Sequence, residues 1–177
     1  SSTSRGLGDV YKRQQSSPSA TYGNYNTAVG YISLFTNVVG SSLTALGYGA
    51  LYFNTASSNT AVGYQALYNN TTGTPNTAVG YNALVANTTG IANTAVGYQS
   101  GGNTTTGTNN TAVGHYALAT NVIGVQNTAI GSSALYNATS NYSVAIGQNA
   151  LYSATTGGNN TAIGVNANIY NQIGTDN

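Results

Sequence analysis

The sequence predicts an all-β protein, a parallel β-roll or β-helix solenoid of nine stacked coils of 16 or 17 residues each. Three observations predict this fold. A five-residue core, Asn-Thr-Ala-Val-Gly, returns along the chain at that period, short apolar segments alternate with Asn, Thr and Gly, and the repeats carry almost no charge. So strict a period marks one structural unit repeated in space. The glycines that end the cores are Gly30, Gly47, Gly63, Gly80, Gly97, Gly114, Gly131, Gly147 and Gly164.

Composition divides the 177 residues into three segments. Residues 1–14 hold four of the five charged side chains, and the run Asp9–Gln14 resembles the in-frame translation of a transposon end used in sequencing libraries. A native basic lead-in is the alternative. Residues 15–25 are a further lead-in, and residues 26–174 form the repeat domain, which we expect to be a fragment cut at both ends. The fold is therefore predicted from the repeat domain alone.

Each unit is predicted to contain two short extended pieces. The first is Thr-Ala-Val, as at Thr77–Val79, where Thr and Val occupy alternate positions and share one face of a strand. The second is Ala-Leu with a neighbour, as at Ala83 and Leu84. Asn, Thr and Gly connect the pieces, because Gly and Asn tolerate positive φ. The two 16-residue units lack the turn glycine, so the deletion falls in a loop and the strand register is kept.

Two apolar columns running along the stack are predicted to form the core. Burying one Val and one Leu per coil contributes about 3 to 6 kcal/mol, whereas ordering the backbone costs about 1 to 2 kcal/mol for every residue of the coil. So thin a core favours further burial against identical chains, most naturally in a homotrimer. The first column is Val29, Leu46, Val62, Val79, Val96, Val113, Ile130, Ile146 and Ile163, and the second is Leu34, Leu51, Leu67, Leu84, Leu118, Leu135 and Leu151.

The run Ser143–Gly147, Ser-Val-Ala-Ile-Gly, resembles the motif of the head domains of trimeric autotransporter adhesins, the YadA-like family, and the eight other cores are similar to it. The resemblance covers residues 26–164. It implies a left-handed parallel β-roll with three chains around one axis, on the outer surface of a bacterial cell. Similar repeats occur in phage tail fibres and virion spikes. The units here are longer than the family's usual head repeat, and Thr stands where the family often has Val.

The residue types exclude several classes of function. No Asp, Glu, Lys or Arg lies between Gln14 and Thr175, so general acid and base groups are missing and we expect no enzyme and no cofactor. So neutral a surface fits neither nucleic acid nor anionic lipid, and no apolar run approaches the roughly 20 residues of a membrane span. The paired glycines Gly101-Gly102 and Gly157-Gly158 lack the lysine of a phosphate loop.

His115 is the one group of the repeats that titrates near neutral pH. It stands where other units have Tyr, so we interpret it as a replacement in a column. Three copies meeting on a trimer axis would be the alternative, a metal site, but no second type of ligand supports it. We therefore predict no metal.

Tyrosines are the best candidates for a binding surface. The column Tyr31, Tyr48, Tyr64, Tyr81 and Tyr98 would offer flat ring faces with a hydroxyl edge, suited to sugars or protein surfaces, and the alternative is packing between coils or chains. A parallel column of threonines invites a different reading, an ice-binding face. An ice-binding face usually consists of two parallel Thr columns. Here there is one Thr column, and the Val column beside it is predicted to point inward.

The predicted function is therefore a structural and adhesive segment of an extracellular fibre, a bacterial surface adhesin head or a phage tail fibre. It would mediate attachment to a host-surface protein or glycan. An ice-binding or carbohydrate-binding repeat protein is the alternative.

Overall fold

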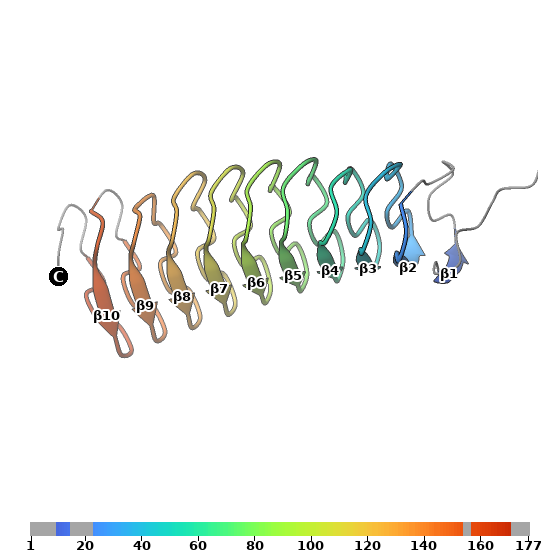
Figure 1. The fold of residues 1–177 in the computed structure, drawn as a ribbon. Coiled ribbons are helices and arrows are strands. Elements are labelled where there is room, and N and C mark those ends of the chain that lie inside the picture. Colours follow the sequence, from blue (N-terminus) through green and yellow to red (C-terminus); the bar gives the residue numbers. More distant parts are fainter. Residues whose placement is uncertain (1–9, 15–22, 154–156, 171–177) are drawn as a thin grey trace, which may run out of the picture.

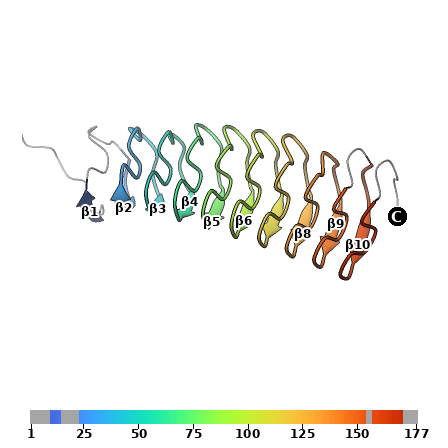
Figure 2. The same ribbon diagram turned by 180° about the vertical axis from the view of Figure 1, so that it is seen from behind.

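The structure, a computed structural model, describes residues 10–14, 23–153 and 157–170. Within them one parallel sheet runs the length of a rod, and its strands follow in chain order, with one coil between each pair of neighbours from β2 on (Figure 1). The view from behind shows the same stack of coils (Figure 2). The strands are β1 Val10–Gln14, β2 Thr27–Tyr31, β3 Thr44–Leu46, β4 Thr60–Val62, β5 Thr77–Val79, β6 Thr94–Val96, β7 Thr111–Val113, β8 Thr128–Ile130, β9 Val144–Ile146 and β10 Thr161–Ile163.

The predicted parallel β-solenoid is confirmed, and β2 to β10 coincide with the nine repeated cores. Equivalent residues lie opposite one another, as Thr77 does with Thr94. Register survives both short coils, where Thr44 pairs with Thr60 and Thr128 with Val144. The strand β1 comes from the segment that we set aside, and it pairs with β2 over five residues.

Alanine, and not valine, faces the interior from each of the strands β2 to β10. Each central alanine of these strands is buried, whereas the Thr before it (Val144 in β9) and the Val, Leu or Ile after it are partly or fully exposed. The prediction that the Val column forms the core is therefore wrong. The side chains in question are Val29, Leu46, Val62, Val79, Val96, Val113, Ile130, Ile146 and Ile163.

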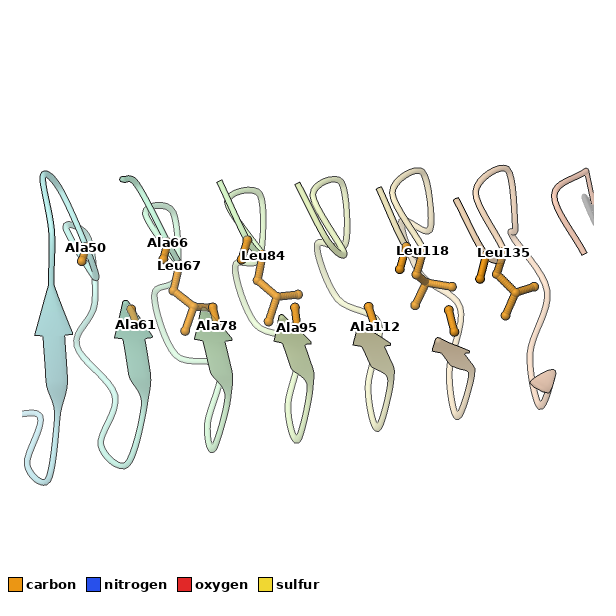
Figure 3. Close-up of a cluster of buried hydrophobic side chains, with 14 of the residues drawn as sticks. Ala50, Ala61, Ala66, Leu67, Ala78, Leu84, Ala95, Ala112, Leu118 and Leu135 are labelled. Atoms are coloured by element: carbon orange, nitrogen blue, oxygen red, sulfur yellow. The ribbon is translucent and has the colours of Figure 1, made fainter. Parts of the chain in front are cut away.

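The physical reason is the alternation of a strand. Because Thr and Val flank one residue, they share a face, and alanine alone takes the other. Only a methyl group fits there, since the leucines of the opposite side fill the narrow interior. Figure 3 shows Leu67, Leu84 and Leu118 reaching toward the alanines of the strands.

The leucine column is buried, as predicted. Its members Leu34, Leu51, Leu67, Leu84, Leu118, Leu135 and Leu151 are at most 2% exposed. In the coil that begins with β6 the column is interrupted, because Gly101 occupies the position of the leucine.

The second piece of each coil is not extended, which corrects the prediction. It is a series of turns, and every leucine of the column has a left-handed backbone, with φ of 51° at Leu67 and 49° at Leu84. Such a conformation is unfavourable for a residue with a Cβ, so the free energy gained by burying the leucine side chain must offset the cost of the backbone conformation. Hydrogen bonds still join consecutive coils here: the Leu67 amide donates to the Ala83 carbonyl at 3.0 Å.

Buried asparagines fasten each coil to the next. The Asn76 Oδ1 accepts from the Asn93 amide at 2.9 Å, while its Nδ2 donates to the Gly90 carbonyl at 2.8 Å. Asn93 and Asn110 repeat the arrangement one and two coils further on. Each bond contributes about 0.5 to 1.5 kcal/mol net, and the buried amides would be costly without these partners.

The core glycine is required by its surroundings. Gly80 has φ of 140°, and a Cβ added to it would lie 2.3 Å from the Gly97 carbonyl oxygen of the next coil. Side chains rarely adopt that backbone, and the contact is closer than any real Cβ makes. The repeat of Gly after Val therefore follows from the close stacking of coils.

Candidate functional site

Six rings, one per coil, directly follow the core glycines of β2 to β7. We call this row the tyrosine ladder; it consists of Tyr31, Tyr48, Tyr64, Tyr81, Tyr98 and His115. Consecutive rings stack along the rod. Their centroids lie 5.6, 5.1, 5.0, 5.1 and 5.3 Å apart, with interplanar angles of 22° or less between the tyrosines. This spacing follows from the rise between parallel strands, about 4.8 Å.

Stacking changes what the ladder offers to a ligand. Each tyrosine remains 41 to 46% exposed, but from Tyr48 to Tyr98 both ring faces lie against neighbouring rings, so the exposed part is the ring edge with the hydroxyl. We expected flat ring faces, which are covered inside the row. The ladder instead presents a line of neutral hydroxyls at a regular spacing.

His115 ends the ladder as a ring among rings, which confirms that it replaces a tyrosine in the column. It stacks on Tyr98 at 5.3 Å and meets Tyr116 edge-on at 4.3 Å. Within residues 10–14, 23–153 and 157–170 there is no group of three His, Cys, Asp or Glu side chains that would hold a metal ion.

Two tyrosines beside the ladder have altered acidity. Burial raises the pKa of Tyr68 above its ordinary 10.0, and the neighbouring Tyr52 raises it further. Desolvation also raises the pKa of Tyr116, and a hydrogen bond with Tyr98 adds to the effect. Both phenols are therefore neutral at physiological pH and act as hydrogen-bonding groups.

The sheet face is the outer surface of β2 to β10, formed by the Thr column and the Val, Leu and Ile column on either side of the buried alanines. Both columns run from β2 to β10 without a charged side chain. Val96 is 37% and Ile130 39% exposed, so this face carries an unbroken, partly apolar stripe. Sequence reasoning had placed the stripe inside.

A second row of rings lies on the leucine side, one residue after each leucine. Phe35, Tyr52 and Tyr68 stack at 5.1 and 4.9 Å, and Tyr136 stacks on Tyr152 at 5.1 Å. Between the two runs stand Val85, Gly102 and Ala119, which carry no ring. The second row is therefore broken in the middle of the rod.

The break belongs to the coil that begins with β6, which departs from the leucine column, the second ring row and the asparagine column at once. Gly101 stands for leucine, Gly102 for a ring, and Thr104 for the asparagine of other coils. The Oγ1 of Thr104 and the Oδ1 of Asn87 are buried without a hydrogen-bond partner. Sequence reasoning tested the paired glycines only as a phosphate loop and missed this gap, although the missing leucine in an otherwise regular column was the signal.

Comparison with protein-family models, with curated proteins and with solved structures finds no match for this chain. Among the described residues no helix is long and apolar enough to cross a membrane. The functional argument therefore rests on the surfaces of the rod itself.

Proposed function

We propose that the chain is a non-catalytic structural and adhesive segment of an extracellular fibre, on a bacterial surface or a virion tail, and that it works as a homotrimer. The observation that carries the proposal is the sheet face, an unbroken stripe of Val, Leu and Ile beside a column of Thr on coils that carry no charged residue from β2 to β10. Apolar surface exposed over such a length marks an interaction site.

A second copy of the chain is the partner that fits this face. Its own stripe has the same spacing from coil to coil, so two or three copies match residue for residue along the axis. The interior of most coils holds two alanines and one leucine, as at Ala61, Ala66 and Leu67, so burial between chains would add apolar contact to a thin core. The resemblance to YadA-like heads implies three chains and left-handed coils.

Attachment is the second part of the proposal. The tyrosine ladder leaves its hydroxyl edges in solvent along one corner of the rod, with no charge beside them. Hydroxyls of this kind donate and accept hydrogen bonds, which suits a host-surface protein or a glycan. Because no ion pairs are involved, such attachment would depend little on salt.

The test of assembly is light scattering coupled to size exclusion. We expect the mass to be three times the 17.9 kDa of one chain. Val96→Asp should place a charge in the interface and reduce the mass to that of the monomer, while the circular dichroism of the coil is retained. The control Ile123→Asp, which changes an exposed residue of a turn, should leave the trimer intact. A monomeric wild type would overturn the trimer and leave the solenoid standing.

Ice binding is a second candidate, because the Val column that we expected inside lies beside the single Thr column on the outer face. Thr and Val columns both point outward from one regular parallel sheet, as in Thr77 and Val79. The two candidates exclude each other on this face, since a trimer would cover it. Thermal hysteresis in the wild type that is lost in Val79→Tyr would support the ice-binding candidate, and its absence would reject it.

A further inference from the structure

The break in the second ring row coincides with a cavity of about 110 Å³ on the leucine side of the rod. Its apolar lining comes from Val85, Gly102 and Ala119, the three residues that stand where other coils carry rings. At Gly102 the side chain is absent altogether. The cavity therefore occupies the space of the missing rings.

Two aromatic rings border this cavity at a right angle to each other. Tyr136 and Tyr116 both line it, with centroids 5.8 Å apart and an interplanar angle of 75°. Tyr136 stacks on Tyr152 at 5.1 Å on one face, and among the described residues no ring stacks on its other face. Unlike the tyrosines inside the ladder, Tyr136 thus has a ring stacked on one face only, and Tyr116 meets it edge to ring.

The polar lining consists of neutral hydrogen-bonding groups. Gln99 and Asn103 contribute amides that donate and accept, and Thr120 contributes a hydroxyl whose hydrogen is given to the Tyr136 carbonyl at 2.7 Å. No charged residue occurs between positions 14 and 175, so nothing here balances a charge on a ligand. The site therefore suits an uncharged ligand with several hydroxyls.

We propose that this cavity binds one neutral pyranose ring of a glycan. The sugar ring would lie against Tyr136 on the side that carries no stacked ring, and its hydroxyls would meet the amides of Gln99 and Asn103. Aromatic faces suit the apolar face of a sugar, and a few placed polar groups set its orientation. Pockets for drug-sized ligands measure about 300 to 1,000 Å³, so a smaller cavity takes one ring and leaves the rest of the glycan in solvent.

This inference deepens the proposed adhesive role by naming a site for a glycan. The cavity lies within one chain, across the core from the sheet face, as the leucines of Figure 3 indicate. Sugar binding and trimer formation can therefore fail separately. A trimer that binds no sugar would refute the pocket alone, and a monomer that binds sugar would refute the assembly alone.

The test is titration of the full chain with the methyl glycosides of glucose, galactose, mannose and N-acetylglucosamine, followed by saturation-transfer NMR and calorimetry. We expect at least one glycoside to bind. Gly102→Tyr should abolish this binding, because it fills the cavity with the residue that equivalent positions carry, as at Tyr68 and Tyr136. Its Cβ would lie 3.2 Å from the Gln99 carbonyl, a contact relieved by a small shift.

Two further variants keep the test decisive. Asn103→Ala changes an exposed side chain of the rim without risk to the fold, and should weaken binding by about tenfold if one hydrogen bond to the sugar is lost. The control Tyr142→Ala removes an exposed tyrosine outside the cavity and should leave binding unchanged. Failure of all four glycosides to bind, binding unchanged in Gly102→Tyr and Asn103→Ala, or capture of phenol in place of any sugar would overturn the proposal.

Discussion

The strand side and the leucine side of each coil face one another across the same narrow interior, yet they use the backbone in opposite ways. On the strand side the chain is extended and paired in register, so alternate residues point in and out. On the leucine side the chain turns through left-handed residues, with φ of 51° at Leu67, and one large side chain enters the core. Alternation therefore identifies inward residues on one side of the coil only.

The two sides also tolerate change differently. Every described core from β2 to β10 keeps alanine at its centre and glycine at its end. The leucine side accepts Gly101 in place of leucine, since glycine adopts the same left-handed backbone, with φ of 57°. Variation, and with it the cavity at Gly102, is thus found on the leucine side.

The largest expected effect tests the strand side. Ala95 is 1% exposed, so Ala95→Asp buries a carboxylate without a partner and should cost several kcal/mol, enough to unfold the surrounding coils. Val96→Asp puts the same charge on the sheet face and should cost an isolated chain only about 1 kcal/mol or less. Urea unfolding of both variants below the concentration of assembly measures the difference. Equal losses would contradict the assignment of alanine to the interior.

The next effect sharpens the comparison on the leucine side. Leu67→Ala should lower the free energy of unfolding by about 2 to 5 kcal/mol, because Leu51 and Leu84 would keep the space left by the removed side chain from closing. Leu84→Ala should cost less, since its neighbour in the next coil is Gly101 and one side of its packing is already missing. Denaturant titration of the two variants gives the order. A larger loss at Leu84 would show that the gap at Gly101 is well packed after all.

The repeat fixed much of the fold in advance, because its information is periodic. The nine coils, the parallel register and the buried leucines could all be predicted from spacing and residue type. The outward orientation of Val96 could not be predicted in the same way. Periodicity shows that Thr and Val share a face of the strand, but it does not show whether that face points to the interior or to solvent. Alanine at every central position was the available signal, because a narrow interior admits only a small side chain there.

The candidate sites were predicted less well for a related reason. The tyrosine column was visible in the sequence, but ring orientation depends on the rise between coils, which brings Tyr64 and Tyr81 to 5.0 Å and covers their faces. The cavity at Gly102 arises from side chains that are absent. Residues taken one at a time do not reveal such a gap, whereas aligning all nine coils does.

The smallest expected effect concerns pH, and it again separates the two sides. Between about pH 5 and 9 the free energy of unfolding should stay nearly level, because His115 is the one Asp, Glu, His, Lys or Arg between residues 14 and 175. Above that range the leucine side should respond first. Tyr68 and Tyr116 have pKa values raised above 10.0 in the folded chain, mainly by burial and desolvation.

The sign of this response follows from proton binding. Below the unfolded pKa of about 10 both tyrosines are protonated in both states, so their contribution to stability is complete. Between that value and the raised pKa the unfolded chain has lost the proton that the folded chain retains, so stability falls as the pH rises. Thermal melts from pH 5 to 11 should show this decline, and Tyr68→Phe combined with Tyr116→Phe should reduce its slope. The strand-side variant Thr94→Val, which removes no titrating group, should leave the slope unchanged. A steep loss of stability near pH 6 would instead show that protonation of His115 is coupled to unfolding. It would contradict the place of His115 as one ring among others in the ladder.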